Sequence, residues 1–267
     1  MFIHPQFDPV AVHLGPVSIR WYGLMYLLAF VMFVLLGRHR LRSYSSSTWT
    51  RRDLDDMVFL GVLGVVLGGR LGYVFFYKFS DYLTAPWRAF YVWEGGMSFH
   101  GGLLGTIVAL VIYAKRRDFP ISTVADLVTP TVPIGLGLGR IGNFINAELF
   151  GRPTDVDWCM VFPGAGPECR HPSQLYEAGL EGLGLFTLLW VVSRRPKPPG
   201  TLFWTFITGY GLCRMVVEFF REPDLHLGFI LGPFSMGQVL SLPMVCVGAI
   251  MLARGYQRAA QAARPTG

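Results

Sequence analysis

Seven apolar stretches limit what this chain can fold into more than any other feature of its sequence. They run over Val17–Gly37, Met57–Tyr77, Met97–Ala114, Ser122–Gly142, Ser173–Ser193, Thr201–Phe220 and Phe234–Ala253. Each is close to the ~20 residues that an α-helix needs to cross the hydrocarbon core of a bilayer. The chain is 52% hydrophobic and only 15% charged, with a mean hydropathy of +0.43, which excludes an ordinary soluble domain. We therefore predict an all-α integral membrane protein with about seven transmembrane helices in a single domain over residues 1–267, with a small outer loop region at about 152–172.

The basic residues between these stretches indicate the orientation. Of the 23 Lys and Arg, fourteen fall in alternate connections: Arg38, Arg40, Arg42, Arg51, Arg52, Lys115, Arg116, Arg117, Arg194, Arg195, Lys197, Arg254, Arg258 and Arg264. The opposite connections hold only five: Lys78, Arg88, Arg152, Arg170 and Arg221. Because Lys and Arg mark cytoplasmic loops, we expect the N-terminus outside and the C-terminus in the cytoplasm. The net charge of +6 follows membrane topology, and we predict no nucleic-acid partner.

Four arginines lie within or at the ends of apolar stretches: Arg20, Arg70, Arg140 and Arg214. An arginine near a helix centre costs about 2.5 to 3.5 kcal/mol on insertion scales, so such a residue usually faces a partner or a watery cavity. Arg20 can extend its charge to the outer interface. Counting the helical rise outward puts the other three roughly 20 to 27 Å above the inner edge, in the outer half of the bilayer.

Other polar side chains are expected at a similar depth. Glu218 lies about 26 Å above the inner edge, and His100 opens the third stretch at its outer end. Tyr26 and Tyr210 lie near the midplane, about 14 Å from the start of their helices, which is too deep for the interfacial belt where tyrosine is common. Aromatic packing could explain both tyrosines, but their hydroxyls then need partners. The pattern predicts a polar site toward the outer leaflet.

One segment expected at this depth in the bilayer carries several polar residues: GRIGNFINAELFG, residues 139–151. We expect its end of the helix to loosen and to expose unpaired backbone N–H groups, because glycines recur at 135, 137, 139 and 142. Arg140 adds a planar guanidinium group, which can donate two hydrogen bonds to a phosphate or carboxylate. The backbone N–H groups and this arginine together predict an anion site. Asn143, Asn146 and Glu148 could orient the arginine or bind a polyol. In the alternative interpretation, the glycines permit close helix packing and Arg140 pairs with Glu148 as a strut.

Three further features allow more than one interpretation. Arg214 and Glu218 are four residues apart and could be only a neutralising pair. His100 is the natural candidate for a general base, although a histidine that packs between helices fits equally well. Cys159 and Cys169 share one loop and could form a disulfide if that loop lies on the oxidising side.

The sequence also favours structural roles at several positions. Gly64 and Gly68 have the four-residue spacing that lets helices approach closely, and Asp53, Asp55 and Asp56 fit the acidic first turn of a helix. We see no metal-ligand spacing, and the one aspartate within the apolar stretches is Asp126, near the inner end of the fourth. We therefore predict chemistry without a metal.

Residues 139–151 resemble the signature of the bacterial phosphatidylglycerol:prolipoprotein diacylglyceryl transferase family. Further blocks are similar to family blocks in the same order: WYGLMY (21–26), GGRLGYVFFY (68–77), GGMSFHGG (95–102), RHPSQLYE (170–177) and YGLCRMVVEFFREPD (210–224). The resemblance implies that a diacylglyceryl group moves from phosphatidylglycerol to the lipobox cysteine of a prolipoprotein signal peptide, forming a thioether and releasing glycerol phosphate. It also implies a multi-pass enzyme of the bacterial cytoplasmic membrane whose active site faces the outer leaflet, with no metal and no organic cofactor.

The resemblance assigns roles to individual residues. His100 is the family position for the base, and Arg140 and Arg214 would stabilise the phosphate leaving group. The resemblance also implies that the headgroup is bound by Tyr26, Asn143, Asn146, Glu148, Tyr210 and Glu218, together with Arg140 and Arg214. Arg70, Asp126, Glu177 and Arg221 are expected in supporting positions.

Two other classes of protein remain as alternatives. An anion or lipid transporter would also carry arginines in its spans, but it should show a two-sided pathway and usually an internal repeat, neither of which we find. A headgroup phosphatase would need its own nucleophile or metal site, and His100 alone is weak evidence for such a site.

Overall fold

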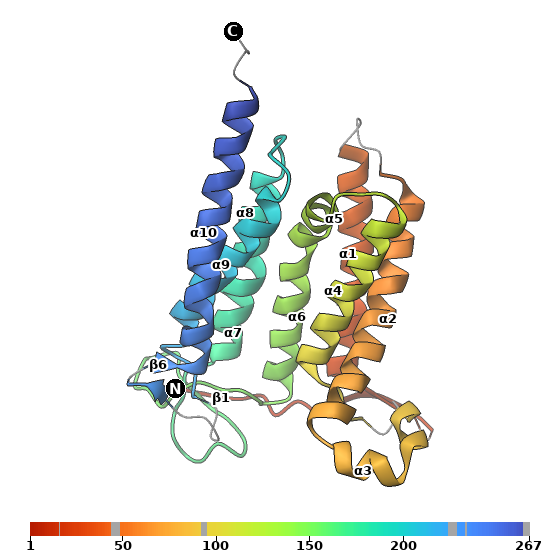
Figure 1. Ribbon diagram of the computed structural model, residues 1–267. Coiled ribbons are helices and arrows are strands. Elements are labelled where there is room, and N and C mark those ends of the chain that lie inside the picture. Colours follow the sequence, from red (N-terminus) through yellow and green to blue (C-terminus); the bar gives the residue numbers. More distant parts are fainter. Residues whose placement is uncertain (16, 44–48, 92–94, 224–228, 233, 264–267) are drawn as a thin grey trace. The chain divides into compact units, whose positions relative to one another are not determined.

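The computed structural model describes residues 1–267 except 16, 44–48, 92–94, 224–228, 233 and 264–267 (Figure 1). Arg264, and Asp224 at the end of the block 210–224, lie outside the described residues. The chain separates into two compact units. The first unit comprises Met1–Phe33 with Asp126–Gly267, and the second comprises Val34–Ala125.

Helices occupy most of every predicted apolar stretch, so the prediction of an all-α membrane protein is confirmed at this level. Within the described residues, five helical stretches are long and apolar enough to span a membrane: Trp21–Arg42, Arg51–Phe76, Ile121–Ile145, Ser173–Val192 and Met236–Ala262. Helix α9 (Thr201–Val217) is apolar but shorter, and α4 covers Phe99–Arg116. Large apolar side chains such as Leu27, Phe59 and Leu183 are exposed on these helices, as lipid-facing side chains would be.

The predicted start of the first helix is wrong. Residues Val17–Arg20 form strand β3, which pairs with the antiparallel strand β2 (Val10–Leu14), and α1 begins at Trp21 and runs to Ser43. Two β-branched residues alternate here with polar ones, which is the period of a strand. Gly15, at φ +61°, adopts a conformation that favours glycine and helps to turn the chain between the strands.

In the second unit, α2 (Arg51–Phe76) packs closely against α4. A Cβ atom added at Gly64 would lie 2.6 Å from the carbonyl oxygen of Gly105, and one at Gly68 would collide with that of Gly101. The helices can approach so closely only because glycine lines both surfaces. The packing role predicted for Gly64 and Gly68 is confirmed.

Asp53 confirms the predicted acidic first turn of α2. Its carboxylate completes a capping box with Thr50. It also accepts hydrogen bonds from the Tyr113 hydroxyl and the Arg117 guanidinium, each at 2.7 Å. These contacts tie the N-terminus of α2 to the C-terminus of α4, which is a structural role.

Arg70 anchors the chain that precedes α4. Its guanidinium is buried and donates through Nε to the carbonyl of Ala89 at 2.8 Å and through Nη2 to that of Arg88 at 2.6 Å. Its Nη1 donates to the carbonyl of Gly95 at 2.5 Å and to that of Gly96 at 3.2 Å. The segment also contains the short helices α3 (Phe79–Thr84) and η1 (Pro86–Phe90).

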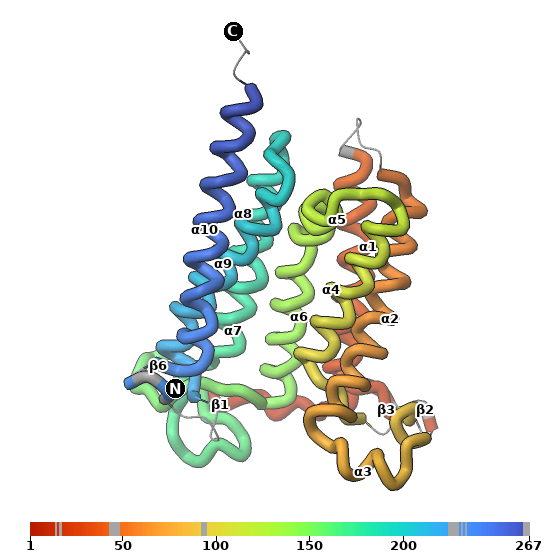
Figure 2. The backbone as a smooth tube through the Cα atoms, in the orientation of Figure 1, coloured from red at the N-terminus to blue at the C-terminus, as the bar shows by residue number. Residues whose placement is uncertain are grey.

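The first unit contains the other helices, except that residues 121–125 at the start of α5 belong to the second unit. Pro130 interrupts the run from α5 (Ile121–Val128) to α6 (Val132–Ile145) with the 3₁₀ turn η3 (Thr129–Thr131), since proline cannot donate to the helical ladder. Next come α7 (Ser173–Glu177), the π-helical segment η4 (Ala178–Gly184) and α8 (Leu185–Val192). Helix α9 then packs along α10 (Met236–Ala262), as Figure 2 shows. Asp126 caps α9 by accepting from the backbone of Gly200 at 2.6 Å and of Phe203 at 2.9 Å.

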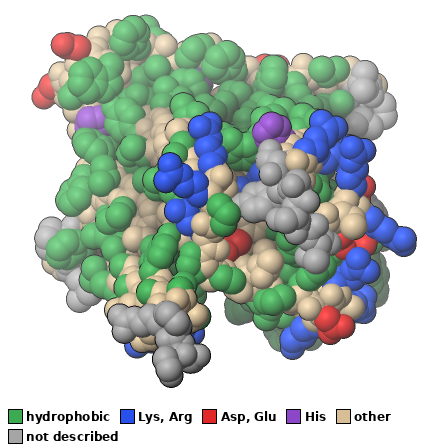
Figure 3. All heavy atoms as spheres, turned by 90° about the horizontal axis from the view of Figure 1, so that it is seen from above, with side chains coloured by type: hydrophobic (Ala, Val, Ile, Leu, Met, Phe, Trp, Pro, Cys, Tyr) green, Lys and Arg blue, Asp and Glu red, His purple; other side chains and the backbone are tan. Residues whose placement is uncertain are grey.

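In each unit, basic residues gather at one end of the helices. In the second unit they lie at the end of α1, the start of α2 and the end of α4. In the first unit they lie between α8 and α9 and toward the C-terminus of α10. Figure 3 looks down on these helix ends and shows Lys and Arg side chains there, with hydrophobic side chains around them.

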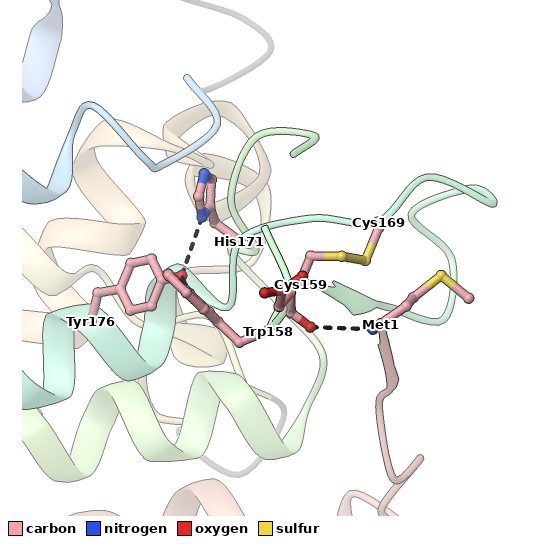
Figure 4. Close-up of a disulfide and its surroundings, with 7 residues drawn as sticks. Met1, Trp158, Cys159, Cys169, His171 and Tyr176 are labelled. Atoms are coloured by element: carbon pink, nitrogen blue, oxygen red, sulfur yellow. Dashed lines mark hydrogen bonds between the residues drawn. A yellow bond between two sulfur atoms is a disulfide. The ribbon is translucent and has the colours of Figure 1, made fainter. Parts of the chain in front are cut away.

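A loop tied by a disulfide lies at the opposite end of the helices of the first unit. Cys159 and Cys169 are bonded, with 5.5 Å between their Cα atoms (Figure 4). Strand β4 (Met160–Val161) pairs in parallel with the N-terminal strand β1 (Phe2–Ile3), and the Met1 amino group donates to the Asp157 carbonyl at 3.2 Å. A two-stranded hairpin, β5 (Phe229–Leu231) with β6 (Phe234–Ser235), precedes α10.

Candidate functional site

Two arginines from different helices meet on one buried glutamate in the first unit. Arg140 of α6 places Nε 2.5 Å from Oε2 of Glu177, and Arg214 of α9 places Nη1 3.2 Å from the same oxygen. The Glu177 side chain is fully buried, while those of Arg140 and Arg214 keep 21% and 11% of their surface exposed. One carboxylate oxygen thus holds two guanidinium groups side by side.

Two further glutamates complete what we call the arginine–glutamate cluster: Arg140, Arg214, Glu177, Glu181 and Glu218. Glu181 lies 3.6 Å from Arg214 and 3.9 Å from Arg140 and is fully buried. Glu218 pairs directly with Arg214, which confirms that the two residues form an i,i+4 ion pair. Opposite charges are required here because an uncompensated charge in a low-dielectric interior costs several kcal/mol.

The backbone around Glu181 explains how the cluster forms. Gly182 of η4 and Gly137 of α6 lie so close that a Cβ on Gly182 would be 2.7 Å from the Gly137 Cα. This close approach brings η4 against the helix that carries Arg140, one turn beyond Gly137. The π-helical turn of η4 widens the helix where Glu181 points inward, and such turns are common at functional sites.

The prediction that glycines loosen the end of α6 is wrong. Helix α6 is regular through Ile145, so its backbone offers no loosened N–H groups for an anion. Instead, a Cβ on Gly142 would be 2.8 Å from the Tyr22 ring, and Gly137 contacts Gly182. For these two glycines, the alternative of close helix packing is the correct one, and any anion binding by this segment must depend on Arg140.

The alternative in which Arg140 forms a strut with Glu148 is also wrong. The exposed Glu148 carboxylate accepts instead from the Asn146 amide at 2.6 Å. The backbone beside it is strained, since Ala147 and Leu149 have φ of 55° and 54° although neither is glycine. Gln174 holds this turn by donating to the Glu148 carbonyl at 2.6 Å.

Gly151, the last residue of the signature, fills a place where no side chain fits. A Cβ there would lie 2.6 Å from the His171 carbonyl oxygen and 2.5 Å from that of Phe220. Its backbone bridges to Arg221, and its N–H donates to His171 at 2.9 Å. The signature loop is therefore fastened to the chain on both sides of the cluster.

Next to this loop, three side chains connect the disulfide loop to α7 (Figure 4). The Trp158 indole donates to the Tyr176 hydroxyl at 2.7 Å, and that hydroxyl lies 3.1 Å from Nδ1 of His171. Burial lowers the pKa of His171 below its usual value, so its neutral form is favoured.

The other predicted site residues are placed as follows. Asn143 is buried in α6, and its carbonyl accepts from the Glu148 backbone at 2.9 Å. Tyr26 is 42% exposed and packs edge to face on Tyr22, with 5.2 Å between ring centroids. Tyr210 stacks on Phe206 at 5.8 Å. Both tyrosine rings thus make aromatic contacts, as one interpretation of the sequence proposed. Headgroup binding by these tyrosines stays a prediction.

His100 belongs to the other compact unit. It is exposed in the first turn of α4, which Ser98 caps, and its ring contacts that of Phe99 at 5.7 Å between centroids. The role of His100 as a base therefore stays a prediction.

Sequence reasoning missed Glu181 and gave Glu177 only a supporting place. A signal was present, because these two carboxylates are four residues apart in an otherwise apolar run, LYEAGLEGLGLF, residues 175–186. A pair of glutamates on one face of a spanning helix calls for cationic partners. The described residues include no group of three or more His, Cys, Asp or Glu side chains arranged to hold a metal ion.

Comparison with known proteins gives this geometry its context. A family model described as prolipoprotein diacylglyceryl transferase matches residues 9–254. A protein of Cupriavidus metallidurans named phosphatidylglycerol–prolipoprotein diacylglyceryl transferase is 56% identical over 261 residues, covering 97% of each chain. Proteins of the same name from Bordetella avium and Nitrosomonas europaea are 53% and 54% identical, covering 98% and 96% of this chain and 99% and 93% of their own lengths. The chain therefore belongs to the prolipoprotein diacylglyceryl transferase family.

Proposed function

We propose that this chain transfers the diacylglyceryl group of phosphatidylglycerol to the thiol of a prolipoprotein lipobox cysteine, with the arginine–glutamate cluster as its phosphate site. The observation that carries the proposal is the pair of guanidinium groups held together on Glu177 inside an apolar helical unit. The names of the relatives support the same transferase reaction.

The phosphate of the lipid is the group that needs the arginines. As the cysteine sulfur bonds to the glyceryl carbon, the bond from that carbon to the phosphate oxygen breaks and its electron pair stays on the phosphate. Arg140 and Arg214 can donate several hydrogen bonds to that developing charge. Both side chains keep part of their surface exposed, which leaves donors available to a ligand.

The thiol must lose its proton for this reaction. A cysteine with an ordinary pKa of about 8.5 is mostly protonated at pH 7, so a base raises the fraction of thiolate. We propose that His100 accepts the proton, because histidine is the side chain that most often acts as a general base and this imidazole is exposed at the start of α4.

The lipid headgroup has further proposed contacts. Asn146 and Glu148 form a hydrogen-bonded pair at the end of α6, and Asn143 lies one turn before them. Tyr26, Tyr210 and Glu218 are proposed to orient the headgroup from α1 and α9.

We further propose a single catalytic domain with seven spans in the bacterial cytoplasmic membrane, the N-terminus outside and the site facing the outer leaflet. Helices at all seven apolar stretches and basic residues at one end of each unit support this topology. The disulfide between Cys159 and Cys169 supports an oxidising location for their loop.

The test is a mass measurement on purified protein in detergent, incubated with phosphatidylglycerol and a lipobox peptide. The proposal predicts that the peptide gains one diacylglyceryl unit at its cysteine and that glycerol phosphate is released. A peptide of unchanged mass after incubation with folded protein would contradict it, and lipid flux into vesicles would then favour the transporter alternative.

A further inference from the structure

Three buried side chains form a row of hydrogen-bond acceptors along the segment from α7 to η4. Gln174, Glu177 and Glu181 lie three and then four residues apart, and each is fully buried. This spacing places them on one helix face. We call these residues the acceptor row.

The oxygen atoms of the acceptor row outnumber the hydrogen-bond donors that the described residues direct at them. Oε1 of Gln174, Oε1 of Glu177 and both carboxylate oxygens of Glu181 accept no hydrogen bond from the described residues. The contacts of Glu181 with Arg214 and Arg140, at 3.6 and 3.9 Å, are longer than hydrogen bonds. Buried polar atoms are nearly always hydrogen-bonded in folded proteins, so these oxygens indicate a missing donor.

Holding the arginines accounts for only part of the row. Glu177 uses one oxygen, Oε2, for both guanidinium groups. The Glu181 carboxylate forms ion pairs with the same arginines at distances longer than a hydrogen bond, and Gln174 uses only its amide nitrogen, on the Glu148 carbonyl. The unused atoms are all acceptors, which a phosphate cannot satisfy because it is itself an acceptor.

A ligand that fits both halves of this site carries a phosphate next to hydroxyl groups. Its phosphate takes the donors of Arg140 and Arg214, and its hydroxyls donate to the acceptor row. We infer that Glu181, with Gln174 and Glu177, binds the hydroxyls of the glycerol headgroup and selects phosphatidylglycerol by them. This inference rests on the proposed function and adds the residues that recognise the headgroup hydroxyls.

The experiment compares two lipids that differ only in these hydroxyls. Phosphatidylpropanol keeps the phosphate and the three-carbon chain of the phosphatidylglycerol headgroup but lacks both hydroxyls. Transfer of diacylglyceryl to the lipobox peptide is measured as kcat/KM for each lipid. For the unaltered protein we expect a preference for phosphatidylglycerol of about 10- to 100-fold, the range for a hydrogen bond to a charged group.

The variant Glu181→Met keeps a similar volume and removes both oxygens. We expect its preference to fall toward 1, because transfer from phosphatidylglycerol should slow more than transfer from phosphatidylpropanol. Glu181→Gln, which keeps one neutral acceptor, should give an intermediate preference and supplies the test if the methionine variant does not fold. Asp155→Asn, in the exposed outer loop, serves as the control and should keep the full preference.

Two results would overturn the inference. One is an equal loss of rate with both lipids in the Glu181 variants, which is what a purely structural carboxylate would give. The other is an unaltered protein that uses both lipids equally well. If the unaltered protein transferred diacylglyceryl from neither lipid, the proposed function itself would fail.

Discussion

Replacing Glu177 by leucine should separate the two arginines that it holds. Arg140 and Arg214 approach the same Glu177 oxygen at 2.5 and 3.2 Å, and the carboxylate is fully buried. Removing one partner of a buried ion pair costs about 3 to 5 kcal/mol, because the remaining charge loses its compensation. The two guanidinium groups would then repel each other with only Glu181 and Glu218 nearby.

The expected result is a folded but less stable protein that transfers slowly. Displacing a donor that stabilises a developing negative charge typically lowers kcat by about 10² to 10³-fold. The assay is diacylglyceryl transfer to a lipobox peptide, with thermal unfolding measured on the same sample. Glu177→Gln keeps the shape and should lose less of both activity and stability than Glu177→Leu.

A matched control removes an exposed carboxylate from a buried arginine that keeps a second carboxylate partner. Glu168 lies 3.1 Å from Arg170 in the outer loop, with 56% of its side chain exposed. Because Arg170 also pairs with Glu222, and a solvent-exposed carboxylate adds little to an ion pair, Glu168→Gln should change neither measurement appreciably. A Glu177→Leu protein that transfers at the rate of the unaltered protein would refute the view that this carboxylate organises the site.

Four further outcomes are expected. Arg140→Ala abolishes transfer while the protein still inserts and folds, and near-normal turnover in such a variant would remove the argument for a phosphate site. His100→Gln slows transfer most at pH 7 and least near pH 9, where a thiol with a pKa of about 8.5 ionises unaided; a pH-independent loss would show that His100 is not the base. Because burial lowers the pKa of His171, the unfolded chain binds its proton more readily, so this residue favours unfolding as the pH falls below about 6.5; the loss of melting temperature between pH 7.5 and pH 5 should be smaller in His171→Gln. Gly68→Ala, which forces a Cβ into the Gly101 backbone, should cost at least about 1 to 3 kcal/mol of stability, and an unchanged melting temperature would contradict the described packing.

Local sequence features predicted the helices and one of the ion pairs. The apolar stretches needed only their length and composition, because a bilayer imposes both on any helix that crosses it. Arg214 and Glu218 could be paired from a spacing of four residues. Asp53 was correctly assigned to a helix start because a capping box is also local.

The centre of the site depends on contacts that local patterns do not encode. Arg140 and Arg214 each meet Glu177 across 37 positions of sequence, and the π-helical turn that places Glu181 has no distinctive residue pattern. The sequence does not reveal that η4 packs on α6, so Glu148, which is close in sequence, was the expected partner of Arg140. The same packing assigns Gly137 to a helix contact, and the contact of Tyr22 with Gly142 does so for Gly142, rather than to a loosened helix end.

The most direct test of the central claim is an experimental structure with a phosphatidylglycerol analogue that cannot be cleaved, such as a phosphonate. The measurement is the distance from the phosphonate oxygens to the guanidinium nitrogens of Arg140 and Arg214. Our account predicts contacts of about 2.7 to 3.2 Å to both arginines. An analogue bound elsewhere, with both arginines still paired only with Glu177, Glu181 and Glu218, would contradict it.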